Sequence, residues 1–70
     1  MRKLRIKEVL DEKGVSQGKL SRGADVPQEP IRRMIRDPYY NAQVYTLMRI
    51  AEYLGVSLDY LYTDAESPNP

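Results

Sequence analysis

The 70-residue sequence contains neither cysteine nor histidine. Their absence excludes disulfide bonds, zinc sites built from thiolate or imidazole ligands, thiol nucleophiles and histidine general bases. It is also compatible with a reducing compartment. The hydroxyls of Ser16 and Ser21 have no histidine to activate them, so we interpret them as capping and packing groups. We therefore expect no enzymatic activity, and no metal or other cofactor.

Long apolar runs are missing as well. No segment approaches the ~20 apolar residues of a membrane-spanning helix, and no signal-peptide core follows the basic start of the chain. No segment has the pattern of a β-strand, and no glycine-rich phosphate loop is present. The sequence predicts an all-α, cytoplasmic protein without a membrane partner.

The charge of the chain is unevenly distributed although its net value is only +1. Residues 1–36 carry ten Lys and Arg against five Asp and Glu, which gives +5. Residues 37–70 carry one against five, which gives −4. The N-terminal half therefore carries the electrostatic surface that would attract an anionic partner.

A single small domain of this size depends on helix caps and close packing for its stability.

Two short helices joined by a tight turn are predicted within residues 16–36. Ser16 is expected to cap the first helix, residues 17–24, because its hydroxyl can accept from an unpaired backbone N–H. Pro27 fixes φ where the second helix, residues 28–36, begins. We expect the rest of the chain to be organised around these two helices and their turn.

The second of these helices has two unlike faces. Ile31, Met34 and Ile35 recur at the spacing of one apolar face. The remaining positions carry mostly amide, carboxylate and guanidinium groups. Such a face is either a solvated surface or a nucleic-acid-binding surface, because amides and guanidinium groups suit base edges and phosphates.

Three further helices are predicted around this pair, over residues 4–13, 42–54 and 58–62. The expected starts and stops are Gly14 after the first, Asn41 before and Gly55 after the second, and Ser57 before the third. The helix 42–54 is the most apolar and is predicted to be the central core helix, through Val44, Leu47, Met48, Ile50, Ala51 and Leu54. We expect one domain over residues 1–63 and a disordered tail over residues 64–70.

The helix pair and the last helix together resemble a known family. Gln17, Ser21, Asp25-Val26 and Ile31 match its glutamine, small residue, turn and second-helix positions, and LGVSLDYL (54–61) matches its leucine-rich end. The chain resembles the lambda-repressor-like (XRE-type, Cro/CI-like) helix-turn-helix family over about residues 6–62. The resemblance implies a compact five-helix, all-α DNA-binding domain.

The chain departs from the family pattern at the turn and in the core. Asp25 stands where the family usually has glycine, and aspartate tolerates a left-handed backbone. Leu10 and Ile35 stand where the family commonly pairs an arginine with a glutamate. Because a buried ion pair spends much of its attraction on desolvation, packed aliphatics can replace it. We therefore expect Leu10 and Ile35 to touch. Pro30 is acceptable only within the first turn of its helix.

The resemblance also implies binding roles. The second helix of the pair enters the major groove while the first crosses the backbone. Gln28 is expected to read adenine and Arg33 guanine, while Glu29 either accepts from cytosine or pairs with a nearby arginine. Gln17 is expected to brace Gln28. Phosphate contacts are assigned to Gln17, Lys19, Arg22, Arg32, Arg36, Tyr39, Tyr40 and Asn41, although one of these tyrosines can instead pack on the core while the other is merely exposed.

The function implied is that of a sequence-specific bacterial or phage transcriptional regulator at the nucleoid, a repressor acting by operator occupancy. The alternative is an antitoxin or adaptor that uses the same fold to bind another protein. We expect a weak homodimer through the last helix on a two-fold operator, with Tyr53, Tyr60 and Tyr62 as anchors. Otherwise these tyrosines only cap a monomeric core.

Overall fold

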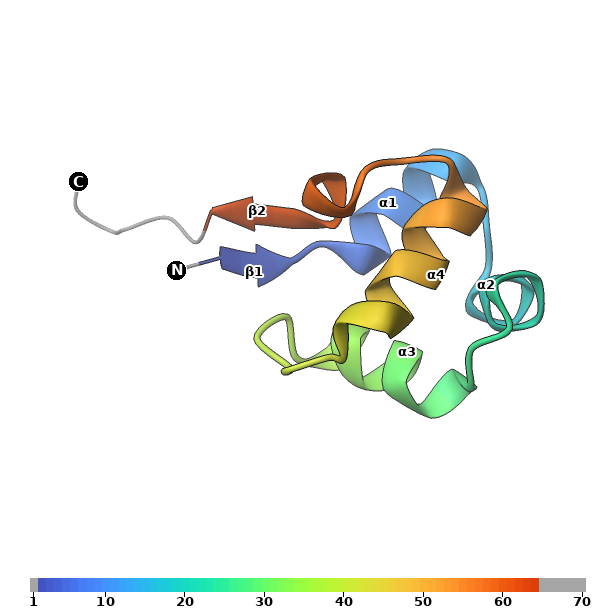
Figure 1. The fold of residues 1–70 in the computed structure, drawn as a ribbon, viewed down its shortest axis with the longest axis horizontal. Helices are drawn as coiled ribbons and strands as arrows, with labels where there is room; N and C mark the ends of the chain where they lie inside the picture. The colour runs from blue at the N-terminus through green and yellow to red at the C-terminus, as the bar shows by residue number, and fades with distance from the viewer. Residues whose placement is uncertain (1, 65–70) are drawn as a thin grey trace.

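The computed structural model of the protein describes residues 2–64. Its elements in chain order are strand β1 (Arg2–Leu4), helices α1 (Ile6–Lys13), α2 (Gln17–Ala24), α3 (Gln28–Arg36) and α4 (Val44–Leu54), the 3-10 helix η1 (Leu58–Leu61) and strand β2 (Tyr62–Asp64). The α-helices gather around one core, and the two strands extend from it side by side (Figure 1). Asp64, the first residue of the predicted tail, belongs to β2, and the rest of that tail lies outside the described residues.

Local capping begins α2 and ends α1, α2 and α4 at the residues predicted. The Ser16 hydroxyl accepts from the backbone N–H of Lys19 at 3.1 Å and so begins α2. Gly14 and Gly55 close α1 and α4 in the left-handed region, with φ of 66° and 72°. Asp25 closes α2 in the same conformation with φ of 59°, which confirms the expectation for the turn.

The ends of α3 also agree with the prediction. The helix begins at Gln28, so Pro30 is its third residue and lies in the first turn. An N–H at that position would have no intrahelical partner, and its absence costs nothing. At the other end Asp37 has an extended backbone with ψ of 98°, because the residue before Pro38 is excluded from the helical region.

The prediction that the chain contains no strand is wrong. β1 pairs with β2 in antiparallel register, with Arg2 opposite Asp64 and Leu4 opposite Tyr62. The backbone N–H of Leu4 also donates to the carbonyl of Pro38 at 2.8 Å. As a result the first helix begins at Ile6 rather than near Leu4. Three-residue strands are too short to display an alternating pattern, and their partners lie at opposite ends of the chain, so no local signal predicts them.

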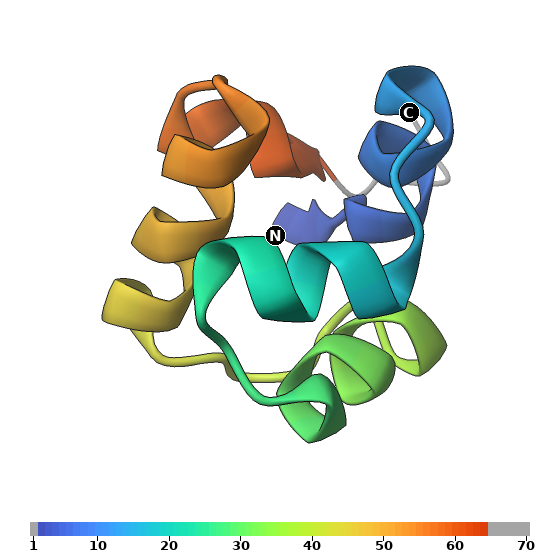
Figure 2. The same cartoon turned by 90° about the vertical axis from the view of Figure 1, so that its right-hand side faces the viewer.

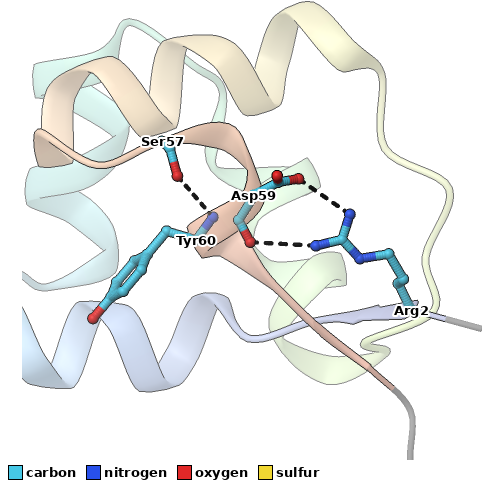
Figure 3. Close-up of polar contacts among 4 residues, drawn as sticks. All are labelled: Arg2, Ser57, Asp59 and Tyr60. Atoms are coloured by element: carbon cyan, nitrogen blue, oxygen red, sulfur yellow. Dashed lines mark hydrogen bonds and ion pairs between the residues drawn. The ribbon is translucent and has the colours of Figure 1, made fainter.

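The last predicted α-helix is also corrected, because residues 58–61 form the 3-10 helix η1. The Ser57 hydroxyl caps it by accepting from the backbone N–H of Tyr60 at 3.2 Å, as expected (Figure 3). The chain then extends at once into β2. The Arg2 guanidinium fastens β1 to η1 by donating to the Asp59 carboxylate at 3.2 Å and to the Asp59 carbonyl at 3.5 Å (Figure 3). The described residues thus contain four α-helices instead of five.

The helix α4 begins at Val44, and Gln43 precedes it without a side-chain cap, so Asn41 is not its N-cap. Leu47, Ile50, Ala51 and Leu54 are buried as predicted. Val44 and Met48, which were predicted to lie in the core, are 61% and 56% exposed. At about 100° per residue, they lie roughly 120° and 160° around the helix from Ile50. The helix is apolar over more of its surface than the core can cover.

The core is formed by one cluster of buried side chains from every helix. Of the apolar residues predicted for α3, Ile31 and Met34 are buried in it, and Ile35 is partly buried and packs against it. Leu10 and Ile35 line the same hollow with Val15. Direct contact between the two side chains stays a prediction. Within residues 2–64, no helix combines the length and the apolar character needed to cross a membrane.

Candidate nucleic-acid interface

The helix pair α2 and α3 is joined by a turn that is closed from within. The backbone N–H of Val26 donates to the carbonyl of Ser21 at 3.0 Å, and the Ser21 hydroxyl donates in return to the carbonyl of Val26 at 2.5 Å. Val26 itself is buried. Ser21 was interpreted only as a small packing residue, so its hydroxyl has a role that the sequence analysis missed. Figure 2 shows α2 and α3 lying against each other on either side of this turn.

The turn is also fastened from α4. The Arg49 guanidinium donates to the Asp25 carboxylate at 3.3 Å and to the Asp25 carbonyl at 3.4 Å. It also lies over the ring of Tyr45, 5.9 Å from the centroid. Sequence reasoning assigned no role to Arg49. A signal was available, because Arg49 is the one basic residue in the acidic half of the chain, residues 37–70.

A second contact between α2 and α4 depends on Gly23. A Cβ at this position would lie only 2.1 Å from Cε1 of Tyr53, so the tyrosine ring rests directly on the bare backbone of α2. Gly23 lies inside a helix, where glycine is unfavourable by about 1 kcal/mol relative to alanine. The close approach of Tyr53 explains why the helix carries glycine here.

The polar face of α3 points to solvent. Ile31 and Met34 are buried, as predicted, and the side chains of the opposite face are exposed. Lys19 and Arg22 extend the exposed cationic surface onto α2. Lys19, Arg22 and Arg36 take part in none of the ion pairs formed within residues 2–64. The exposed residues on α3 are Gln28, Glu29, Arg32, Arg33 and Arg36.

Glu29 pairs with two arginines on this face. Arg33 Nε donates to Glu29 Oε2 at 2.9 Å, and Arg32 Nη1 lies 3.6 Å from Glu29 Oε1. The hydrogen bond from Arg33, aided by the charges of all three arginines of α3, holds the pKa of Glu29 below its usual value. The same hydrogen bond raises the pKa of Arg33. Of the two roles considered for Glu29, the structure shows the arginine pairing.

A family model described as helix-turn-helix matches residues 6–61, from the start of α1 to the end of η1. The chain belongs to the lambda-repressor-like helix-turn-helix family. This confirms the resemblance, and it makes the chain a DNA-binding domain of the XRE type. No curated protein matches the chain.

The expected contact between Gln17 and Gln28 is not formed by a hydrogen bond in this structure. Gln17 and Gln28 are both exposed, and no hydrogen bond joins their side chains among those found in the described part of the chain. The amide Nε2 of Gln28 lies instead 4.0 Å from the position that a Cβ on Gly18 would occupy. The bracing of Gln28 by Gln17 therefore stays a prediction for the DNA-bound protein.

The loop after α3 divides its two tyrosines between core and solvent. Tyr40 is partly buried and packs against the core, and it lines a hollow with Arg33, Arg36 and Asp37. Tyr39 is 53% exposed, and Asn41 is exposed beyond it. This matches the alternative in which one tyrosine packs and the other is exposed. Phosphate contacts by the three loop residues stay a prediction.

Proposed function

We propose that this protein is a sequence-specific transcriptional regulator that inserts α3 into the major groove of duplex DNA and represses by occupying its operator. The observation that carries the proposal is the exposed face of α3, where amide and guanidinium groups stand opposite a buried apolar face. Together, α2 and α3 present five Lys and Arg residues (Lys19, Arg22, Arg32, Arg33 and Arg36). Such a surface suits the phosphate backbone, and the amides suit base edges.

Base readout is assigned to Gln28, facing adenine, and to Arg33, facing guanine. Residues five apart on a helix are separated by about 7.5 Å along the axis and roughly 140° around it. The two side chains can therefore meet successive base pairs when the N-terminal end of α3 points into the groove. A cytosine contact by Glu29 competes with its two arginine partners. The proposed backbone contacts are Gln17, Lys19, Arg22, Arg32, Arg36, Tyr39, Tyr40 and Asn41.

Binding as a homodimer to a two-fold operator is part of the proposal, because one small module contacts few base pairs. The tyrosines of the last segment are already engaged within the chain. Arg5 lies over the Tyr60 ring at 4.5 Å and Arg2 over the Tyr62 ring at 4.9 Å. These contacts favour the alternative in which tyrosines cap the core. A protein that sediments as a monomer both free and on its operator would remove the dimer from the proposal.

A protein-binding role as an antitoxin or adaptor is the second candidate function. It is favoured by an exposed apolar hollow between α4 and the segment leading into η1, lined in part by Tyr45, Met48, Val56 and Leu58. An apolar hollow of this kind suits a protein partner better than DNA. In either role we propose a cytoplasmic protein that performs no catalytic step and holds no cofactor.

Selection of bound duplexes from a random DNA pool tests the proposed function. We expect a short consensus, and affinity for it that falls steeply as salt concentration rises, because cationic contacts release counterions from the phosphates. Binding to random DNA should show a similar salt dependence at lower affinity. A protein that recovers no consensus and shows no salt-dependent DNA binding would favour the antitoxin or adaptor role.

A further inference from the structure

Glu29 is the one acidic residue on the exposed face of α3, among three arginines. Each of its carboxylate oxygens is engaged by a different arginine, Oε2 by Arg33 and Oε1 by Arg32. A cytosine amino group would have to share these oxygens with the two arginines, which already draw the carboxylate toward the helix surface. The arrangement is therefore better suited to holding side chains of the protein than to contacting a base.

The contact with Glu29 uses only one edge of the Arg33 guanidinium. Arg33 donates through Nε, which leaves the N–H groups of Nη1 and Nη2 available. A planar fork of two such nitrogens is the group that binds O6 and N7 of guanine side by side. The carboxylate thus fixes the plane of the guanidinium and leaves its base-reading end free.

Folding stability does not explain this ion pair. The side chains of Glu29 and Arg33 are 57% and 56% exposed, and exposed pairs at i, i+4 spacing add little to stability. The ion pair between Glu29 and Arg33 affects DNA binding instead. A long arginine side chain loses rotamer freedom when it docks on a base, and a partner that already restrains it reduces that loss. Glu29 is ionised at neutral pH even at the ordinary pKa of a glutamate, and the Arg33 hydrogen bond lowers its pKa further.

We propose that Glu29 is a positioning residue for base readout: it holds Arg33 against α3 so that the Nη1–Nη2 edge meets one base position. This inference rests on the proposed function. The same carboxylate removes one unit of positive charge from the binding face, which weakens binding to DNA of any sequence. Glu29 therefore raises discrimination and lowers nonspecific affinity together.

The test measures the affinities of Glu29→Gln and Glu29→Asp for the selected operator, its single-base variants and one random duplex. The variant Arg33→Ala first identifies the base position that Arg33 reads. Glu29→Gln should tighten binding to the random duplex by roughly two- to fivefold at low salt, because it removes a negative charge that repels the DNA phosphates. It should lower discrimination at the Arg33 position by roughly three- to tenfold, which is part of what one bidentate arginine–guanine pair supplies.

The other variants separate charge from position. Glu29→Asp keeps the charge but is shorter by one methylene, so it should lower discrimination and leave random-duplex affinity unchanged. Glu8→Gln on α1 is the matched charge control, because Glu8 forms no ion pair within residues 2–64, and it should leave discrimination unchanged. In an Arg33→Ala background, Glu29→Gln should cause no further loss of discrimination.

Two results with the variants would overturn the inference. If Glu29→Gln relaxes a base position other than that of Arg33, Glu29 contacts a base itself. If all affinities rise alike and discrimination is unchanged, the carboxylate acts only as a charge. A wild-type protein that prefers no duplex refutes the proposed function and this inference with it. That outcome is distinct, because it is seen before any variant is measured.

Discussion

Replacing Gly23 by alanine tests the contact that joins α2 to α4. The new Cβ would lie 2.1 Å from Cε1 and 2.4 Å from Cζ of Tyr53, distances at which one group must move. Overpacking of this kind typically costs ~1–3 kcal/mol, while the gain in helix propensity from Gly to Ala returns about 1 kcal/mol. We expect a net destabilisation of up to about 2 kcal/mol, with a fall in Tm of about 4–8 °C for each kcal/mol.

Gly18 supplies the matched control for this prediction. It lies in the same helix, but a Cβ there would lie 3.5 Å from Nη1 of the flexible Arg22 side chain, an ordinary van der Waals distance. Gly18→Ala should therefore stabilise the domain by up to about 1 kcal/mol through helix propensity alone. The two substitutions are chemically identical and should have opposite signs.

A double-mutant cycle removes the remaining ambiguity. In a Tyr53→Ala background the obstacle to a Cβ at position 23 is gone, so Gly23→Ala should now stabilise by about 1 kcal/mol. Urea unfolding followed by far-UV circular dichroism gives all four free energies of unfolding. If Gly23→Ala stabilises the wild-type protein as much as Gly18→Ala does, the Tyr53 ring does not rest on α2 in solution and our reasoning is wrong.

Three further predictions follow from other contacts. Ile35→Glu should lower the free energy of unfolding by about 2 kcal/mol, because it places a carboxylate in the partly buried hollow beside Leu10. Adding Leu10→Arg should restore much of this stability. If the double variant melts no higher than the single variant, the two side chains are not neighbours. Tyr60 donates to Glu12 at 2.7 Å, and this hydrogen bond, with burial, raises the pKa of Tyr60 above 10.0. This contact therefore stabilises the fold fully at pH values below the pKa of Tyr60 in the unfolded chain, and the stabilisation is lost as pH rises through the higher pKa of the folded protein. Tyr60→Phe should reduce the loss of stability at alkaline pH, and the exposed control Tyr39→Phe should leave it unchanged. On the selected operator, Gln28→Ala and Arg33→Ala should each lower affinity by roughly 5- to 150-fold and remove the preference at one base position. Lys19→Ala and Arg36→Ala should instead lower affinity for all duplexes alike and reduce the salt slope by about one. If Arg33→Ala lowers affinity equally for every base variant, Arg33 contacts a phosphate and not a base.

Local chemistry predicted most of the fold. The bounds of α2 and α3 follow from Ser16, Pro27 and the Asp37-Pro38 step, each of which acts on its own backbone or the nearest turn. The left-handed conformation of Asp25 was predictable for the same reason, because few other residues tolerate it. The family's spacing then indicated which residues form the candidate interface. Those that belong to α3 are all exposed in the structure.

The failures have a different origin. The pairing of β1 with β2 joins the two ends of the chain, and neither strand is long enough to show a period. The exposure of Val44 and Met48 reflects how wide a face the other helices cover, which the apolar pattern of α4 alone does not state. Both errors concern where an element lies relative to distant residues, and single-sequence patterns carry no such information.

The two contacts that fasten the helix pair to α4 were missed for this reason, yet the residues that make them stand out in the sequence. Gly23 breaks the helix-forming character of α2, and its reason is Tyr53, thirty residues further along the chain. Arg49 is the one basic side chain in an acidic half, and its partner is the carboxylate of Asp25. A contact between helices explains each residue: Gly23 gives the Tyr53 ring room to lie on α2, and Arg49 binds the residue that ends α2. Because both contacts join α4 to α2 or to the turn before α3, the orientation of α3 for binding depends on a helix that carries none of the proposed base-reading side chains.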